Sequence, residues 1–261
     1  MEPKPKPLPY LGKDARGLIV DNRDGKTVPV GYGDNEFSIQ VIPRKAAVEM
    51  IRAHHYSHTI VNNSTLHLGL FIRGRWLGTL QFGYLKNPRT MGRIVAGTEV
   101  DEYLELNRMW LNDRAPRNSE SRAISHAIRL IRVIRPKVKW IQSFADERCG
   151  RWGVVYQAAN FLFCGSHLTR FYELDGQTYH EQQMSVRKAK YLGPGTRARY
   201  LQDNKDRATL RTCQQFRYIY FIDRRALEHL RFKVQPYPKP PGHDREVAIR
   251  RRERKASRKA S

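Results

Sequence analysis

Five side chains with acid–base or metal-binding potential follow one another at His54, His55, Tyr56, Ser57 and His58. They come directly after a segment with helical periodicity, at a point where the chain must turn and become exposed. Imidazoles and phenols move protons and bind metals, which makes this cluster a candidate reaction site. The same imidazoles would also suit the negative end of a helix dipole, so an end-capping role stays open.

A second candidate is Asp146, which directly follows a predicted strand at residues 138–145. Open α/β sheets bind ligands at the carboxyl ends of their strands, where this carboxylate would lie. An aspartate in that position also serves as an ordinary turn or helix-capping residue, and the local sequence does not decide between these roles.

A third candidate is the junction that runs from Arg108 through residues 118–121, where a predicted strand leads into the start of a long helix. Free backbone amides at the start of a helix suit a pyrophosphate group. Ser119 and Ser121 stand at that start, next to Glu120. A serine with a glutamate nearby is also typical of an ordinary helix cap.

The elements that must position these candidates alternate between strands and helices. Strand patterns occur at 37–42, 66–72, 76–82, 103–111, 138–145, 161–164, 168–174 and 218–222, and helical patterns at 45–54, 118–135 and 154–159. Residues 73–75 have the composition of a hairpin turn. This order predicts the α/β fold class, with one mixed central sheet flanked by helices.

Composition divides the chain into three parts. We expect residues 1–34 to form an arm rich in proline and lysine, residues 35–235 a catalytic domain, and residues 236–261 a basic tail. The 48 Lys and Arg residues outnumber the 25 Asp and Glu residues and give a formal net charge of +23. This charge attracts polyanions, so double-stranded DNA is the expected partner, although a basic ribosome-associated protein would carry the same signal.

The three cysteines, Cys149, Cys164 and Cys213, form no close pair, so neither a disulfide framework nor a cysteine-based zinc site is expected. No stretch approaches the roughly 20 apolar residues of a membrane span, and the N-terminus lacks an apolar signal segment. We therefore expect a protein without membrane contact in a reducing cytoplasm, the host cytoplasm if a phage encodes it. Nothing in the sequence indicates the oligomeric state.

Several short motifs occur in an order that resembles the Mom family of phage DNA-modification proteins. They are His55–Ser57, Leu106–Met109, Asn118–Ser121 and Phe144–Asp146 with Gly153–Ala158. Their arrangement also follows the strand, loop and helix order of acetyl-CoA-dependent N-acyltransferases. The glycine-rich phosphate loop of those enzymes is missing, and residues 114–119 stand in its place.

The resemblance implies an acetyltransferase-like (GNAT-like) fold. It also implies that the protein places a carbamoylmethyl group on the exocyclic amine of adenine in DNA, which shields phage DNA from host restriction enzymes. By motif position the resemblance makes His55, Tyr56, Asp146 and Tyr156 catalytic, and it assigns Arg108 and Ser121 to binding of acetyl-CoA, with the DNA backbone as the alternative contact of Arg108. Ser119, at the same predicted helix start, is a further candidate for acetyl-CoA binding.

The implied product joins a nitrogen to what would be the methyl carbon of an acetyl group. That carbon is nucleophilic when deprotonated, as the amine already is, so the reaction needs a change of polarity such as oxidation by a metal. Iron or a similar redox metal is therefore a candidate cofactor, with ligands His55, Tyr56 and Asp146, and with His58 as a substitute for one of them. Tyr56 could instead orient the substrate or relay a proton.

An adenine inside a duplex must leave the base stack before its amine can react. Phosphate contacts from the basic tail would support this step, and the predicted contact residues are Arg250, Arg251, Arg252, Arg254 and Lys255. Three alternatives stay open: an ordinary acetyl-CoA-dependent N-acetyltransferase, a non-enzymatic basic DNA-binding protein, and a metal nuclease built on residues 54–58.

Overall fold

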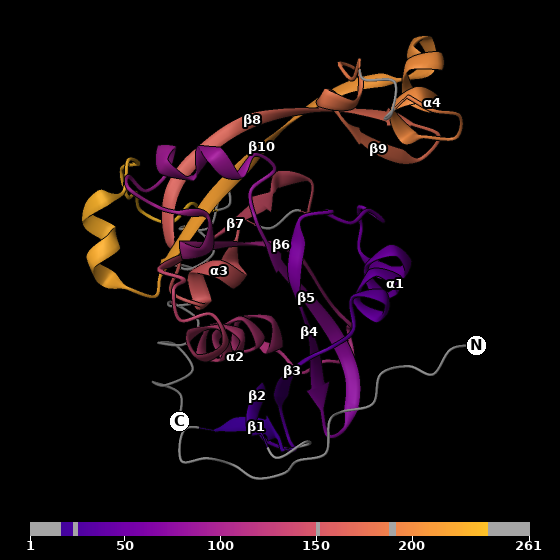
Figure 1. Cartoon of the computed structure of the whole chain (residues 1–261). Coiled ribbons are helices and arrows are strands. Elements are labelled where there is room, and N and C mark those ends of the chain that lie inside the picture. Colours follow the sequence, from indigo (N-terminus) through magenta and orange to yellow (C-terminus); the bar gives the residue numbers. More distant parts are fainter. Residues whose placement is uncertain (1–16, 23–25, 150–151, 188–191, 240–261) are drawn as a thin grey trace, which may run out of the picture.

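One sheet organises the part of the chain that the computed structural model describes, which is residues 17–22, 26–149, 152–187 and 192–239 (Figure 1). Within these residues the strand order is β1-β2-β3-β4-β5-β6-β7-β10-β8-β9. The strands are β1 (Leu18–Asp21), β2 (Val28–Gly33), β3 (Ser38–Val41), β4 (Ser64–Ile72), β5 (Arg75–Gly83), β6 (Tyr103–Leu111), β7 (Trp140–Asp146), β8 (Leu162–Leu174), β9 (Gln177–His180) and β10 (Thr209–Phe221).

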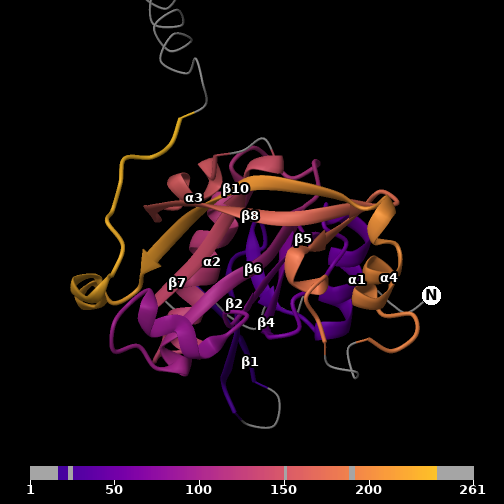
Figure 2. The ribbon, with the colours of Figure 1, turned by 90° about the horizontal axis from the view of Figure 1, so that it is seen from above.

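The helices are α1 (Arg44–His54), α2 (Ser119–Ile134), α3 (Val154–Ala158) and α4 (Arg197–Asp203). Figures 1 and 2 show α1 and α2 on opposite sides of the sheet. The apolar stripe of α2 is fully buried in the main core, which gathers Ala123, Ile124, Ala127, Ile128 and Ile131 against the strands. The predicted fold class, a mixed central sheet flanked by helices, is therefore confirmed.

β1 and β2 depart from the sequence prediction, because we expected residues 1–34 to be an extended arm. β1 and β2 instead pair with each other, and β2 pairs with β3 at the edge of the sheet. Leu18 and Ile19 are buried. Such short apolar runs cannot form an independent unit, but the existing sheet gives them a surface to pack on. Residues 1–16 of the predicted arm lie outside the described residues.

The second departure is the length of β8 and β10. The polar residues Gly165, Ser166 and His167 interrupt the apolar pattern, so the sequence predicts two strands where the structure has the single strand β8. Pairing with β10 carries the strand through this interruption. The two strands form a ribbon that projects beyond the rest of the sheet and carries β9 and α4 (Figure 1). A small cluster of Leu174, Tyr179 and Leu201 packs there, separate from the main core.

The strands β6 and β7 pair in parallel for only a short distance. Their register covers Tyr103–Glu105 against Trp140–Gln142, although both strands continue beyond it. The Ser143 hydroxyl then donates to the Leu106 carbonyl at 3.1 Å, which joins the two strands just beyond this register. Past this point the strands separate, and the sheet opens along the inner edges of β6 and β7.

The last described residues follow the body of the protein. The backbone amide of Gln235 donates to the Phe163 carbonyl at 2.9 Å, and the Tyr237 hydroxyl donates to the Phe161 carbonyl at 2.8 Å. Residues 236–239 of the predicted tail are thus described, whereas the predicted DNA contacts Arg250, Arg251, Arg252, Arg254 and Lys255 lie outside the described residues. No helix in the described ranges is long and apolar enough to span a membrane.

Candidate active site

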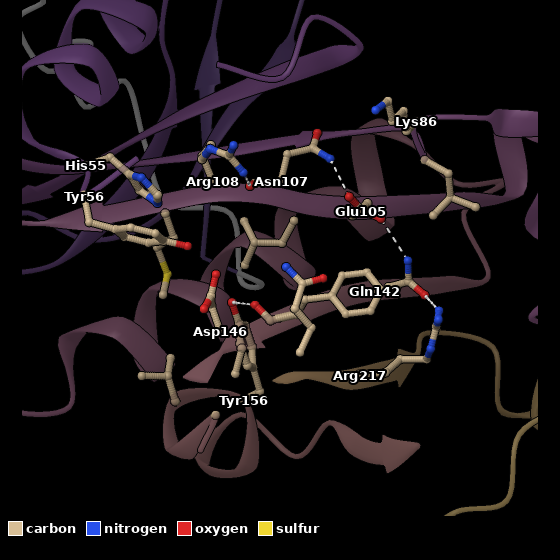
Figure 3. A pocket seen from close by; sticks show the side chains of 18 of the residues that line it. His55, Tyr56, Lys86, Glu105, Asn107, Arg108, Gln142, Asp146, Tyr156 and Arg217 are labelled. Carbon is tan, nitrogen blue, oxygen red and sulfur yellow. Dashed lines mark hydrogen bonds between the residues drawn. The ribbon is translucent and has the colours of Figure 1, made fainter. Parts of the chain in front are cut away.

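A cavity of about 1160 Å³ lies where β6 and β7 separate. Its walls come from both strands, from the segment after α1, from α3 and from β10. Five residues predicted from the sequence line it together: His55, Tyr56, Arg108, Asp146 and Tyr156 (Figure 3). These residues are far apart in the sequence, and the tertiary structure brings them together around this cavity.

His55 is the buried member of the histidine cluster. The backbone N–H of Ser57 donates to its Nδ1 at 3.1 Å, so Nδ1 carries no hydrogen and the neutral ring has its hydrogen on Nε2. Burial, followed by the positive charges of Arg108 and His58, lowers the pKa of His55 to about 3. His55 is therefore neutral at physiological pH, and its Nε2 is a hydrogen-bond donor.

Asp146 is held by an arginine from the turn that follows β7. Arg148 Nε lies 3.0 Å from each carboxylate oxygen, and a second guanidinium nitrogen also binds the carboxylate. Burial alone would raise the pKa of Asp146, but the hydrogen bonds and charge of Arg148 outweigh it and lower the pKa. The Arg148 guanidinium also lies 5.9 Å from the ring centre of Tyr56, whose ring is 4.3 Å from that of His55. His55, Tyr56 and Asp146 thus belong to one cluster around Arg148.

The predicted metal ligands do not fit a metal ion in this arrangement. A ligating histidine ordinarily donates from its second nitrogen, whereas Nδ1 of His55 accepts a hydrogen bond and Nε2 carries the hydrogen. The Asp146 carboxylate is already bound to Arg148, and His58 Nδ1 is 2.9 Å from the Arg52 carbonyl. Among the described residues, no group of three or more His, Cys, Asp or Glu side chains is placed to hold a metal.

Tyr156 reaches the cavity because α3 packs closely against β10. The helix starts at Gly153, which has a φ of 75°, and a Cβ at this position would lie 2.2 Å from the Tyr218 ring. Only glycine permits both this conformation and this approach. The Tyr156 hydroxyl lies 2.9 Å from the Ser143 hydroxyl and donates to it, because the single Ser143 hydrogen is used for the Leu106 carbonyl. The glycine thereby places a phenol beside the point where β6 and β7 separate.

Arg108 contributes a guanidinium to the opposite wall. It donates to the Thr59 carbonyl at 3.0 Å and to the Asn107 carbonyl at 2.7 Å, so it ties the segment after α1 to β6. The sequence prediction grouped Arg108 with Ser119 and Ser121 for cofactor binding. The structure places Arg108 in the cavity between β6 and β7, and the two serines line a different cavity.

That second cavity, of about 830 Å³, lies at the N-terminus of α2. Ser119 is buried there, and the Ser121 hydroxyl donates to the Asn118 carbonyl. Asn118 stands at the N-cap with a φ of 67° and makes no side-chain hydrogen bond to the helix, so the expected cap is not formed. Five arginines line this cavity: Arg73, Arg75, Arg114, Arg117 and Arg122. Helix start and arginines together suit an anionic ligand.

At the other end of the larger cavity is a group of polar residues that sequence reasoning missed, apart from Asn107 in the motif Leu106–Met109. Asn107 and Gln142 each donate an amide hydrogen bond to Glu105, at 3.0 and 2.8 Å, and Arg217 donates to the Gln142 carbonyl oxygen at 2.6 Å (Figure 3). Burial raises the pKa of Glu105, although both amide hydrogen bonds favour its ionised form. The available signal was a glutamate in an otherwise apolar stretch of β6, at Tyr103–Leu106.

Comparison with known proteins identifies relatives over most of the chain. The methylcarbamoylase mom of Escherichia phage Mu is 53% identical over 213 residues, which is 80% of this chain and 87% of that protein. Among solved structures, the ribosomal-protein-S5-alanine acetyltransferase from Vibrio fischeri has a TM-score of 0.44 at 10% identity, covering 74% of this chain and 97% of its own. The RimL ribosomal L7/L12 α-N-protein acetyltransferase in complex with coenzyme A has a TM-score of 0.42 at 10% identity, over 73% of this chain and 96% of its own.

The family model of the Mom proteins matches residues 36–239, from β3 to the last described residue. This range includes both cavities and the residues that line the site between β6 and β7. The chain belongs to the Mom protein family.

Proposed function

We propose that this protein is a methylcarbamoylase that places a carbamoylmethyl group on the exocyclic amine of adenine in DNA. The observation that carries the proposal is the 53% identity to the methylcarbamoylase of phage Mu over 80% of the chain. At this identity, the two proteins share a fold and can share a site. The motif residues His55, Tyr56, Arg108, Asp146 and Tyr156 line one cavity, and Ser119 and Ser121 line the other. The formal charge of +23 supports a polyanionic substrate.

Acetyl-CoA is the proposed donor, bound with its phosphate groups in the cavity at the N-terminus of α2. The arginines of that cavity and the start of the helix match the charge of a pyrophosphate. Acetyl-CoA would supply the two-carbon unit of the product; joining its methyl carbon to the adenine nitrogen would also require a two-electron oxidant, and a nitrogen donor would replace the departing CoA thiol to form the amide. Ser119 and Ser121 lie at this helix start, as predicted from the sequence, and Arg108 lines the larger cavity, where we propose that the reaction takes place.

The residues around the larger cavity provide fixed donors and charges for the reacting groups. His55 presents an Nε2 hydrogen, because its Nδ1 is engaged by Ser57. The Arg108 guanidinium donates to two backbone carbonyls, which fix its positive charge at the wall of the cavity. Asp146 holds Arg148 in place beside the Tyr56 ring. Such preorganised groups stabilise developing charge without having to reorient during the reaction.

The target adenine must leave the DNA stack to reach this cavity. Enzymes that act on a base inside a duplex commonly flip it into a pocket and recognise it there. A volume of about 1160 Å³ is ample for one base together with the end of the donor. Contacts of the basic tail with DNA phosphates, from Arg250 to Lys255, stay a prediction from the sequence.

Nucleoside mass spectrometry of DNA from a bacterial host that expresses the protein tests this proposal. We expect a new adenine derivative with the mass of a carbamoylmethyl group, and we expect it to disappear in Asp146→Asn because Arg148 loses its partner. Asp203→Asn is the matched control, since Asp203 forms an exposed ion pair with Arg199 on α4, away from both cavities. Circular dichroism of each variant verifies folding.

Unmodified DNA in cells that contain soluble wild-type protein would contradict the proposal. An acetyl mass shift on protein or small-molecule amines would instead indicate an ordinary N-acetyltransferase. DNA binding without any adduct would indicate a non-enzymatic binding protein, and strand scission would indicate a nuclease.

A further inference from the structure

The larger cavity has two chemically different ends (Figure 3). One end holds His55, Tyr56 and Asp146, which the sequence motifs identify. The other end holds Glu105 and Gln142, which lie outside the motifs, and Asn107, a motif residue to which the proposed reaction assigns no role. The second end is built from the inner edges of β6 and β7 at the position where their pairing stops.

Both amide groups beside Glu105 have a defined orientation. Arg217 donates to the oxygen of Gln142 at 2.6 Å, which turns the Gln142 NH₂ group toward Glu105. The Ser64 hydroxyl donates to the oxygen of Asn107 at 2.9 Å, which turns the Asn107 NH₂ group toward Glu105 as well. The two amides therefore cannot exchange donor and acceptor without losing these bonds.

The Glu105 carboxylate, which lines the cavity, can therefore accept further hydrogen bonds. A carboxylate offers about four acceptor positions, and the two amides use two of them, one on each oxygen. In the described part of the chain, both of these bonds come from neutral groups rather than from a cation. A desolvated carboxylate of this kind gains most from an additional N–H donor supplied by a ligand.

Aromatic surface accompanies this acceptor. Phe144 and Phe232 line the same end of the cavity, and the Arg217 guanidinium lies 4.9 Å and 4.5 Å from their ring centres. Aromatic rings and arginine planes are the surfaces on which extruded bases stack. A fixed acceptor next to stacking surfaces is the combination expected of a pocket for a base that carries an amino group.

We propose that Glu105 is the specificity-determining residue for adenine and accepts a hydrogen bond from the exocyclic amine of the flipped base. This inference rests on the proposed function and deepens it. Guanine and hypoxanthine present an oxygen at the same position, which the carboxylate would repel. The oriented amides of Asn107 and Gln142 hold the carboxylate in place for this contact.

The test compares binding to three duplexes that differ in one base opposite an abasic position. The base is adenine, hypoxanthine, which replaces the exocyclic amine with oxygen, or unsubstituted purine, which lacks the amine. We expect wild-type protein to prefer adenine by at least about tenfold, the value of a hydrogen bond to a charged acceptor. Fluorescence anisotropy at one fixed salt concentration measures the three dissociation constants.

Glu105→Gln changes the acceptor into a group that also carries a donor. We expect the preference for adenine over hypoxanthine to disappear or to reverse, because a carboxamide N–H can donate to the hypoxanthine oxygen. Glu105→Asp keeps the carboxylate and should retain part of the preference. Glu173→Gln is the matched control, since Glu173 forms an exposed ion pair with Arg211 on the projecting ribbon. A merely structural role of Glu105 would change stability without changing the choice of base.

The outcomes separate this inference from the proposed function. Modified adenine in host DNA together with an unchanged base preference in Glu105→Gln overturns the inference alone. If Glu105→Gln does not fold, equal binding of adenine and unsubstituted purine by the wild type overturns it. Absence of modified adenine with soluble wild-type protein overturns the proposed function and this inference with it.

Discussion

Asp146 and Glu105 are carboxylates on adjacent strands that line one cavity, and the protein stabilises them in opposite ways. Arg148 binds Asp146 and lowers its pKa despite burial. Glu105 is bound by two neutral amides, and burial raises its pKa. One carboxylate is thus a permanent anion that holds an arginine, and the other is an acceptor with spare capacity. Environments that shift the pKa values of two like groups apart commonly assign them different roles.

The largest expected effect comes from breaking the ion pair at the first carboxylate. Asp146→Asn and Arg148→Met should each lower the free energy of unfolding by about 3 kcal/mol, because each leaves a partly buried charge without its partner. The double variant should lose less than the sum of the two. Urea unfolding of the four proteins forms a double-mutant cycle that measures this coupling. Strictly additive losses would show that the pair contributes little.

A smaller effect is expected at the second carboxylate. Arg217→Met should lower the free energy of unfolding by roughly 1–2 kcal/mol, since the Gln142 oxygen loses its donor. The freed amide can then rotate, so we also expect a weaker preference for adenine in the binding assay. Arg225→Met is the matched control, because the Arg225 side chain is 90% exposed and pairs only locally with Asp223. Equal losses in both variants would argue against an ordered network.

The smallest effect is a difference in the pH dependence of stability. Asp146 has a lowered pKa, so its contribution is present above the pKa of the unfolded chain and is lost as the pH falls through the folded pKa. Glu105 has a raised pKa, so its contribution is present below the unfolded pKa and is lost as the pH rises through the folded pKa.

Substitution should therefore act in opposite directions at the two sites. As the pH rises from acidic to neutral, the loss of unfolding free energy caused by Asp146→Asn should grow relative to wild type. The loss caused by Glu105→Gln should shrink over the same range. Thermal unfolding measured across this pH range checks both slopes. If the stability difference from wild type changed with pH in the same direction for both variants, the two carboxylates would have similar environments.

Much of the fold near the site was predictable, because its elements carry their own periodicity. β6 begins and ends at the predicted residues 103 and 111, and α2 matches the predicted helix within one residue at each end. The ribbon of β8 and β10 was only partly predictable, because Gly165–His167 is strand only through its partner. The strands β1 and β2 were missed for the same reason, since pairing at the sheet edge gives them their structure.

The candidate site shows the same division. Chemical type and local motif pointed to His55, Tyr56, Asp146 and Tyr156, and all four line the cavity. Glu105 was missed because a single glutamate in a strand has no local signal that separates a buried position from an exposed one. Its environment comes from Gln142 and Arg217, which are distant in the sequence.

The sequence by itself determined the alternation of strands and helices, the strong positive charge and the identity of the reactive side chains at the strand and helix ends. These are properties of composition and of local apolar periodicity, which act over a few residues. Only the tertiary structure decided that β6 and β7 separate after Glu105, that Arg148 neutralises Asp146, and that Arg108 lies apart from Ser119 and Ser121. Burial and ion pairing depend on neighbours far along the chain, so the electrostatic state of each group exists only once the sheet is assembled.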